Sequence, residues 1–292
     1  MLNCTNLFEV ISTFSDEKKC LQHLSKVKWN NVVTCSHCNH DKVYAFKDGI
    51  RYKCASCLKQ FNAKTGTIFA NSKIPLTKWF LAVYLALNNK KGVSSVQLAK
   101  HLGITQKAAW HMMMKIRTML GQHAPQHLEK VVEVDETYIG GKAKWKHYKK
   151  RKKHTQGRST LEKTPVFGML QRNGMVKSMP VPDTERGTIQ SIILQYVEPE
   201  SSIMSDEWKA YKYLDAYYDH QHIEHKKYEY VRGEVHTNTI EGYWSHIKRS
   251  ITGCYHHVSR KYMHQYCHEF DFRYNTRKET DSARFNLAMS KV

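Results

Sequence analysis

Long hydrophobic runs are scarce in this sequence. The longest apolar run, residues 79–87, is too short to cross a lipid bilayer. The first six residues, Met-Leu-Asn-Cys-Thr-Asn, lack the basic start and the apolar stretch of a secretory signal peptide. No internal repeat is evident. We therefore expect a cytoplasmic protein that makes no use of a membrane.

Acidic residues are also few. The 292 residues include 26 Asp and Glu against 46 Lys and Arg, for a formal net charge of +20. This excess predicts a polyanionic partner, most naturally nucleic acid, with an anionic membrane surface as the rival. Residues 142–163 alone hold ten Lys or Arg and one acid, which is typical of a mobile loop. With 41% hydrophobic residues, the chain can still build a core and more than one domain.

Four of the eight cysteines form two CxxC pairs that are separated by 15 residues. Thiolates at this spacing can close a tetrahedral zinc site from two turns, and four protein ligands leave no open position for water. We therefore predict a structural Zn²⁺ ion in a zinc ribbon. The alternative is four unrelated buried cysteines, and His37 or His40 could also replace one ligand. The expected ligands are Cys35, Cys38, Cys54 and Cys57.

The N-terminal part reads as helices around this ribbon. We expect a helix over 14–29 with Ser15 as its N-cap, a hairpin around Lys47-Asp48-Gly49, and a helix over 75–88. Residues 92–120 predict two helices around a turn at Gly103, a helix-turn-helix pattern. A plain packed helical pair is the alternative, with Met112 in its core. The residues expected to contact DNA here are Lys107, Trp110, His111 and Lys115.

From residue 130 onward, strands dominate the pattern. The expected order of three strands, helix, strand, helix, strand, helix is the ribonuclease-H-like arrangement of an α/β domain. In this arrangement the first and fourth strands end beside each other. The expected strands are 131–139, 165–171, 175–181, 202–206 and 228–235, and the expected helices are 188–197, 208–218 and 238–251.

Three acids stand where metal-binding carboxylates would be placed. Asp135 ends the apolar run 131–135, and Asp206 follows the run 202–205. Glu241 opens a helical segment 35 positions later. Two carboxylates on strands and one on a helix meet the needs of a two-metal phosphoryl-transfer site. A chain this basic needs a local reason to gather acids, which favours catalysis.

Each acid also has a structural alternative. An Asp after a strand is a common turn or cap residue, and Glu241 could complete a capping box by reaching back to Asn238. Glu133 shares a strand face with Asp135, because side chains alternate along a strand. The side chains that compete as ligands are Glu133, Glu136, Glu207 and Asn238.

Lys248 lies seven residues after Glu241, two helical turns along the same face. There its ammonium could hold a phosphate near the metals. The alternative is a solvated charge pair with Arg249. Trp244 could stack on a base, but a Trp at this position is more often part of a core.

Three sequence blocks resemble those of the zinc-ribbon insertion-sequence transposases, the ISXO-type bacterial members of the Merlin superfamily. The blocks are Val-Asp-Glu-Thr-Tyr-Ile-Gly-Gly-Lys (134–142), Ser-Asp-Glu-Trp-Lys-Ala-Tyr (205–211) and His-Thr-Asn-Thr-Ile-Glu-Gly-Tyr-Trp-Ser-His-Ile-Lys-Arg (236–249). The resemblance covers nearly the whole chain. It implies the domain order 1–30 N-terminal helix, 31–70 zinc ribbon, 75–122 helix-turn-helix and 130–280 ribonuclease-H-like catalytic domain with the basic loop 142–163.

The resemblance implies a DDE transposase that binds terminal inverted repeats and target DNA. Asp135, Asp206 and Glu241 carry over as the three acids, with Lys248 as the basic residue that follows them. Some relatives place Asn at the third position, which keeps Asn238 open. The hypothesis is metal-dependent strand cleavage and strand transfer with two Mg²⁺ or Mn²⁺ ions and Asp135 bridging them.

We expect Lys248 and Arg249 to contact DNA, and at least a homodimer to form on paired element ends. The expected location is the bacterial cytoplasm, at the nucleoid. The alternatives are a transposase-derived DNA-binding regulator without catalysis and a ribonuclease-H-like nuclease that cuts without joining.

Overall fold

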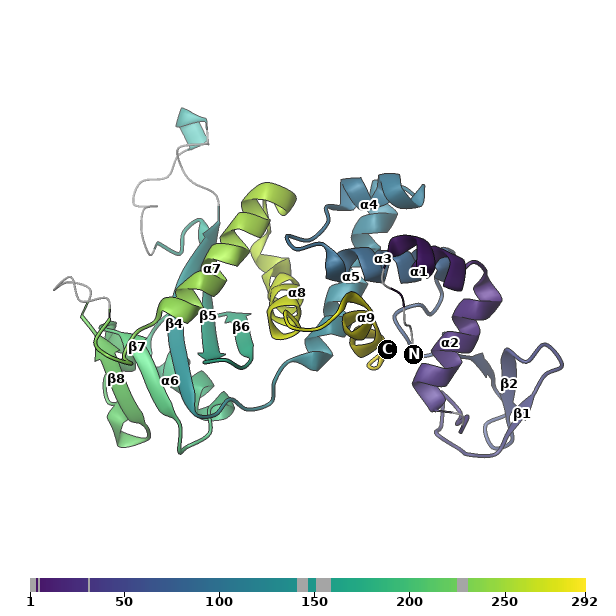
Figure 1. The fold of residues 1–292 in the computed structure, drawn as a ribbon, viewed down its shortest axis with the longest axis horizontal. Helices are drawn as coiled ribbons and strands as arrows, with labels where there is room; N and C mark the ends of the chain where they lie inside the picture. The colour runs from purple at the N-terminus through teal and green to yellow at the C-terminus, as the bar shows by residue number, and fades with distance from the viewer. Residues whose placement is uncertain (1–3, 5, 31, 141–146, 151–158, 225–230) are drawn as a thin grey trace. The chain divides into compact units, whose positions relative to one another are not determined.

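The computed structural model describes residues 4, 6–30, 32–140, 147–150, 159–224 and 231–292, and the chain divides into two compact units (Figure 1). One unit comprises Met1–His123 with Lys278–Val292, and the other is Ala124–Arg277. Most of the predicted basic loop 142–163 lies outside the described residues. Among the residues described, no helix combines the length and the apolar character needed to cross a membrane.

The first unit is a helical body to which the C-terminal segment returns. The Cys4 N–H donates a hydrogen bond to Ser282 Oγ at 2.9 Å, which ties the two ends of the chain together. The predicted N-cap at Ser15 is wrong, because the Asp16 side chain accepts from the Lys19 N–H at 2.8 Å and starts the helix one residue later. The helices of this unit are α1 (Leu7–Thr13), α2 (Glu17–Trp29), α3 (Leu76–Asn88), α4 (Ser95–Leu102), α5 (Gln106–Leu120) and α9 (Asp281–Met289).

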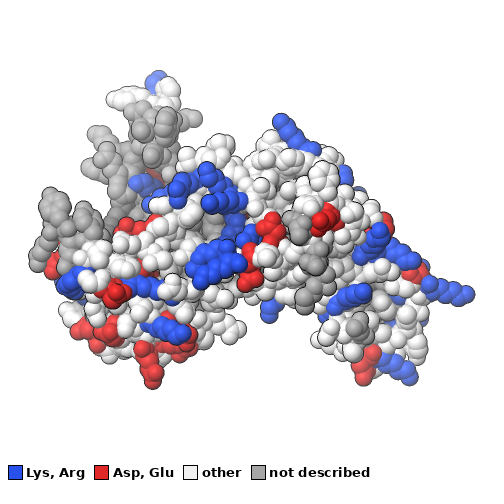
Figure 2. Space-filling model, in the orientation of Figure 1, with Lys and Arg blue, Asp and Glu red and all other residues white. Residues whose placement is uncertain are grey.

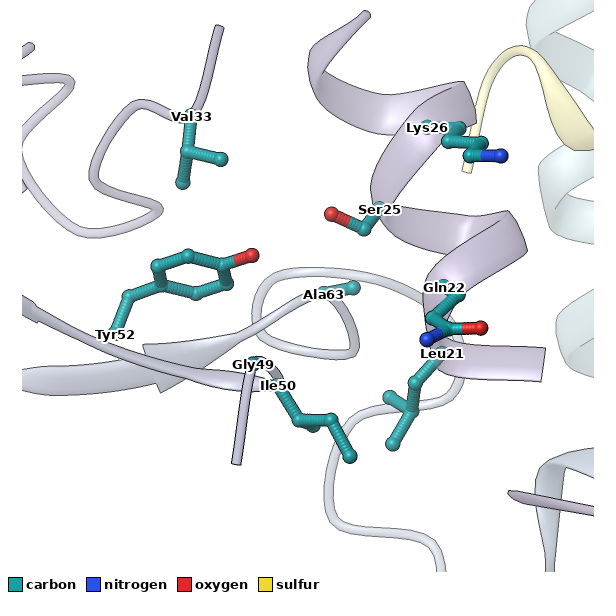
Figure 3. Close-up of a pocket in the computed structure, with 9 residues that line it drawn as sticks. All are labelled: Leu21, Gln22, Ser25, Lys26, Val33, Gly49, Ile50, Tyr52 and Ala63. Atoms are coloured by element: carbon teal, nitrogen blue, oxygen red, sulfur yellow. The ribbon is translucent and has the colours of Figure 1, made fainter. Parts of the chain in front are cut away.

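A small antiparallel sheet follows α2 in the order β1 (Val43–Ala45), β2 (Arg51–Cys54) and β3 (Gln60–Asn62). The predicted hairpin is confirmed: Gly49 adopts φ +67° in the turn, and Asp48 Oδ1 accepts from the N–H groups of Ile50 and Arg51. A cavity of about 430 Å³ lies between this sheet and α2, with the Tyr52 hydroxyl pointing toward Ser25 (Figure 3).

The second unit contains a mixed sheet whose strand order is β6-β5-β4-β7-β8 within the described residues. The strands β4, β5 and β6 are antiparallel neighbours, whereas β7 and β8 run parallel to β4. This is the ribonuclease-H-like order that the sequence predicted, with the first and fourth strands adjacent. The bounds are β4 (Val131–Gly140), β5 (Lys163–Gln171), β6 (Val176–Pro180), β7 (Ser202–Asp206) and β8 (Asp219–Ile223).

The helices of this unit cover the sheet on both faces (Figure 1). Helix α6 (Arg186–Tyr196) packs on one face, where its Ile189 joins Val132 and Val134 of β4 in a buried core. Because side chains alternate along β4, Glu133 and Asp135 point to the opposite face. That face carries α7 (Asn238–Ser250), while α8 (Met263–Asn275) packs against β6. The alternation therefore places Val132 and Val134 in the core with α6 and directs Glu133 and Asp135 toward α7.

Two predicted elements of this unit are wrong. The expected helix 208–218 is two short 3-10 turns, Lys209–Tyr211 and Leu214–Ala216, because Tyr213 between them adopts φ +70°, which a continuous helix does not allow. The fifth strand is Asp219–Ile223 and not 228–235, whose first three residues lie outside the described ranges. Among the described residues this strand pairs along one side only, so its polar side chains can stay in solvent and give no alternating apolar signal.

Candidate active site

The parallel register of β4 and β7 places two acids level with each other. The pairs Val131↔Ser202 and Glu133↔Met204 are the first and last of this ladder. Continuing the same register by two residues brings Asp135 level with Asp206. Strand β4 continues to Gly140, but its pairing with β7 ends before these two residues. The two strands therefore part there, and both carboxylates can face a common space.

Three carboxylates gather at this point. Among the described residues, Asp135, Glu136 and Asp206 each offer a ligand oxygen, and these oxygens all lie within 4.8 Å of one another. Asp135 and Glu136 leave β4 on opposite faces, so they meet around the edge of the strand beyond its last pair with β7. Oxygen donors brought this close form a ligand set for a hard divalent cation.

Each of the three acids accepts a hydrogen bond from its own donor, one on α7 and two in the turn that follows β7. The Trp244 indole Nε1–H on α7 donates to Asp135 Oδ2 at 2.9 Å. The Tyr211 hydroxyl donates to Glu136 Oε2 at 2.8 Å, and the Trp208 backbone N–H donates to Asp206 Oδ1 at 2.9 Å. Sequence reasoning missed Tyr211 and Trp208 as supports, although both follow Asp206 within five positions. The carboxylates are thus fixed by neighbours before any cation binds.

The electrostatics of the group favour a positive partner. Burial, followed by the negative charges of Glu136 and Asp206, raises the pKa of Asp135 to about 8. Burial and the charge of Glu136 also raise the pKa of Tyr211 well above its usual value, so the tyrosine stays a hydrogen-bond donor. Carboxylates that repel one another in a dry setting are stabilised when a cation shares them.

Helix α7 is docked on β4 by the buried carboxylate of Glu133. This residue is 0% exposed, and its Oε2 accepts from the backbone N–H groups of Thr239 and Ile240, both at 2.9 Å. Arg172 Nε donates to Glu133 Oε1 at 2.7 Å from the β5–β6 turn. An anion at a helix N-terminus meets unsatisfied N–H groups and the positive end of the helix dipole. Glu133, which competed as a metal ligand in the sequence, therefore serves as the anchor of α7.

Glu241 and Lys248 lie on α7 with exposed side chains. Glu241 Oε1 accepts from the Thr237 hydroxyl at 3.2 Å, so it makes a local contact at the start of the helix. It stands outside the group of described acids that gather within 4.8 Å. Trp244, which binds Asp135, comes three residues after Glu241 and four before Lys248, so all three share one side of the helix. The structure thus brings Asp135 and Asp206 together and places Glu241 and Lys248 on the neighbouring helix.

The four CxxC cysteines form a second cluster, in the first unit. Their Sγ atoms all lie within 4.8 Å of one another, with 3.6 Å between Cys35 and Cys57 and 3.6 Å between Cys38 and Cys54. Zn–S bonds of about 2.3 Å in a tetrahedron require S···S distances of roughly 3.8 Å, whereas a disulfide requires about 2.05 Å. The spacing therefore fits four thiolates around one zinc ion.

The turns of both pairs support this geometry. The His37 N–H donates to Cys35 Sγ at 3.4 Å, and the Ser56 N–H donates to Cys54 Sγ at 3.3 Å. The residue after each pair, Asn39 or Leu58, adopts a left-handed conformation with φ near +60°. Two similar turns that aim N–H groups at sulfur stabilise thiolates, as a metal site needs.

Two known family models match parts of this chain, one in each unit. The profile of the ISXO2-like transposase domain matches residues 127–275, which is just over half of the chain. The chain belongs to the ISXO2-like transposase family. A transposase zinc-ribbon domain matches residues 15–60, which include all four CxxC cysteines. The two matches confirm the resemblance read from the three sequence blocks and the cysteine spacing.

Relatives of this ISXO2-like transposase come from archaea and bacteria. An uncharacterized protein in transposable element ISH50 of Halobacterium salinarum is 29% identical over 275 residues, covering 90% of this chain and 92% of the relative. An uncharacterized transposase-like protein of Haemophilus influenzae is 26% identical over 101 residues, covering 34% of this chain and 80% of the relative. Among solved structures, the chain matches the Mos1 strand transfer complex at 11% sequence identity. The match covers 70% of this chain and 78% of the Mos1 chain. Its TM-score is 0.24, too low to support any argument.

The predicted helical pair of the transposase is present as α4 and α5. Gly103 adopts φ +57° between them, and the Thr105 side chain caps α5 by accepting from the Ala108 N–H at 3.3 Å. Met112, expected in the core of a packed pair, is buried, and so are Met113, Met119 and Leu120.

One face of α5 exposes Lys107, His111 and Lys115 at four-residue spacing. Lys115 Nζ also donates to the Ile68 carbonyl at 3.1 Å. Trp110 is partly exposed, with its ring centroid 5.1 Å from that of His111. The candidate DNA-contact residues therefore share one accessible stretch of helix.

The end of α7 is basic. Lys248 and Arg249 are exposed, and Arg249 Nε donates to the Ser245 carbonyl at 3.1 Å. Arg260 follows this helix and binds the carbonyls of Thr160 and Lys163 at 2.7 and 2.9 Å, where the basic loop rejoins β5. Figure 2 shows basic side chains gathered over the part of the second unit that holds α7 and α8. Positive charge thus borders the helix that faces the carboxylates.

Proposed function

We propose that this protein is a DDE transposase that binds DNA ends and catalyses metal-dependent strand cleavage and strand transfer. The observation that carries the proposal is the meeting of Asp135 and Asp206 just beyond the last paired residues of β4 and β7. Two carboxylates on neighbouring strands, beside a helix that carries a third acid and a lysine, suit a phosphoryl-transfer site. The family to which the chain belongs supports the same activity.

The donor atoms fit a specific kind of cation at each site. Carboxylate oxygens suit Mg²⁺ or Mn²⁺, whereas four thiolates suit Zn²⁺. Asp135 and Asp206 would hold the catalytic ion, with Glu241 as the third acid and Glu136 beside them. When bound, such an ion supplies Lewis acidity that activates the attacking oxygen and stabilises the leaving oxygen. Asn238, the first residue of α7, stays the alternative to Glu241.

The chain's own residues then have distinct tasks. Trp244, Tyr211 and the Trp208 N–H orient the carboxylates through the hydrogen bonds described above. Lys248, two turns after Glu241, holds a phosphate of the scissile strand by its charge. Arg249, exposed beside it, contacts the DNA backbone. Orientation and charge neutralisation are what phosphoryl transfer requires from a protein.

Recognition of the element ends is assigned to the first unit. The exposed α5 residues Lys107, His111 and Lys115 would enter the major groove of terminal-repeat DNA, with Trp110 beside them. The ribbon, held by one Zn²⁺ ion, adds basic side chains such as Lys42 and Arg51. Because transposition joins two ends, we expect at least a homodimer on DNA.

A strand-transfer assay tests the proposal. Purified protein is incubated with Mg²⁺, labelled DNA that carries the element's terminal repeats, and a target plasmid. We expect cleavage at the repeat ends and a joined product, both lost in Asp206→Asn. Cleavage without joining would identify a nuclease, and end binding without cleavage would identify a regulator. A variant that still cleaves at the wild-type rate would refute the role of Asp206.

A further inference from the structure

Trp244 links the helix that carries the proposed third acid to the strand that carries the first. Its indole Nε1–H donates to Asp135 Oδ2 at 2.9 Å, across 109 positions of sequence. The side chain is 3% exposed, so the bond is shielded from water. Sequence reasoning treated Trp244 as a base-stacking or core residue. Its buried polar contact with a candidate ligand is a more specific role than either.

The sheet is shaped to admit this indole. Gly168 of β5 pairs directly with Asp135 of β4. A Cβ atom at Gly168 would lie 2.5 Å from Trp244 Cη2 and 2.6 Å from Cζ2, closer than real contacts allow. Any side chain at this position would therefore push the ring off the sheet. The absent side chain of Gly168 opens the path by which Trp244 reaches Asp135.

The helix itself is fixed at its start. The Glu133 carboxylate holds the N–H groups of Thr239 and Ile240, one turn before Trp244. Glu133 and Asp135 are successive residues on the same face of β4. Helix α7 is therefore attached to this face at two points, a charge-assisted cap and an indole–carboxylate bond. Two attachments fix both the position and the rotation of a helix.

We propose that Trp244 is a positioning residue that sets Asp135, and α7 with its Glu241 and Lys248, for binding of the catalytic cation. A carboxylate offers about four lone-pair sites, so the bond to Trp244 fixes the orientation of Asp135 while capacity for a cation remains. Partners of this kind behind metal ligands typically change metal affinity about 10–100-fold when they are removed. This inference rests on the proposed function.

The test measures Mn²⁺ binding by calorimetry on the full-length, zinc-loaded protein without DNA. Trp244→Phe removes the indole donor and keeps an aromatic ring. We expect it to raise the Kd for Mn²⁺ about tenfold. The matched control is Trp79→Phe, because Trp79 is also 3% exposed and its indole donates to Ser72 Oγ at 2.8 Å in the other unit. We expect the control to bind Mn²⁺ as the wild type does.

A merely structural role for Trp244 would give a different result. Trp244→Phe would then lower the melting temperature of the zinc-loaded protein without added Mn²⁺, while the Kd of the folded protein for Mn²⁺ would stay at the wild-type value, which overturns the proposal. Asp135→Asn distinguishes failure of the proposed cation site from failure of the proposed role of Trp244. If the wild type binds no Mn²⁺, or if Asp135→Asn binds it equally well, the cation site fails and the role of Trp244 fails with it.

A double-mutant cycle supplies an independent check through Gly168. We expect Gly168→Ala to raise the Kd for Mn²⁺ in the wild-type background, because the new methyl group displaces the indole. In the Trp244→Phe background the colliding ring atoms are gone, so the same change should have a smaller effect. Strictly additive effects would show that Gly168 does not act through Trp244, and would contradict the proposed path.

Discussion

Glu133 and Thr239 lie 106 positions apart, yet the Glu133 carboxylate accepts hydrogen bonds from both the N–H and the hydroxyl of Thr239, at 2.9 and 2.8 Å. The contact seats the N-terminus of α7 on β4. Glu133, two residues before Asp135, therefore anchors the helix. The other two carboxylates of β4, those of Asp135 and Glu136, belong to the candidate cation site.

Glu133→Ala should destabilise the second unit strongly. The substitution leaves Arg172 and two helical N–H groups without their buried anion, and breaking a buried pair costs about 3–5 kcal/mol. The measurement is the free energy of unfolding from urea denaturation. Glu129→Ala is the control, because its ion pair with Lys130 is exposed and is worth about 1 kcal/mol or less. Similar losses for both variants would contradict the anchoring role.

Glu241→Gln should impair DNA cleavage more than Glu136→Gln. Glu136 already accepts a bond from the buried Tyr211 hydroxyl, whereas Glu241 lies one turn from Trp244 on the helix that faces Asp135. We expect the Glu241 variant to lose more than the ~100-fold that loss of an outer support costs. Cleavage rates in saturating Mg²⁺ decide the question. The reverse order would make Glu136 the third ligand, and a similar loss in Asn238→Ala would implicate Asn238.

Each chain should contain one zinc ion that depends on the CxxC thiols. Cys54→Ser removes one of four ligands, so we expect the zinc content to fall well below one ion per chain and the ribbon to unfold, because structural zinc supplies folding energy. Zinc is measured by atomic emission and by release to a chelator. Cys254→Ser, which lies outside the cluster, should keep a full equivalent. Retention of zinc in Cys54→Ser would point to a histidine ligand instead.

The buried Asp271 should make stability depend on pH. Burial raises its pKa to about 7, although its carboxylate accepts hydrogen bonds from the Ser178 N–H and hydroxyl. The folded protein therefore keeps this proton between about pH 4 and pH 7, while the unfolded chain releases it. The contribution to stability is complete below about pH 4 and is lost as the pH rises through 7.

Urea denaturation at pH 5, 6 and 7 tests this sign. The wild-type stability should fall relative to that of Asp271→Asn by up to about 1.4 kcal/mol per pH unit. Subtracting the variant removes the contributions of other titrating groups. A difference that stays constant over this range, or that grows with pH, would contradict the raised pKa.

Lys107 should contribute one phosphate contact to DNA binding. Lys107→Gln should reduce the slope of log K against log salt by about 0.9, and should weaken binding to all sequences alike. Fluorescence anisotropy with terminal-repeat and scrambled duplexes between 50 and 200 mM salt measures both effects. Lys130→Gln, which removes a charge that pairs with Glu129, controls for net charge. An equal change in slope for both variants would show that Lys107 makes no specific phosphate contact, and would contradict the placement of α5 in the DNA interface.

Much of the fold could be predicted because its signals are local. The spacing of the cysteines, the Asp-Gly turn and the apolar runs that begin at 131 and 202 each depend on a few neighbouring residues. Strand β8 and the two 3-10 turns were not predicted, because no local signal in the sequence marks them. The sequence Asp-His-Gln-His-Ile has no apolar alternation, and the left-handed Tyr213 that interrupts a helical pattern is not marked by glycine.

By itself, the sequence was enough to identify the family, the four cysteines that cluster and the two acids on neighbouring strands, since these follow from residue type and spacing. Only the tertiary structure decided how the carboxylates are used. Strand register and packing place Glu133 at the start of α7 and bring Glu136 close to Asp135 and Asp206. They also let Trp244 pack over Gly168, where there is no side chain in its way. Such contacts join residues as much as 109 positions apart. They depend on how elements pack, which no local pattern records.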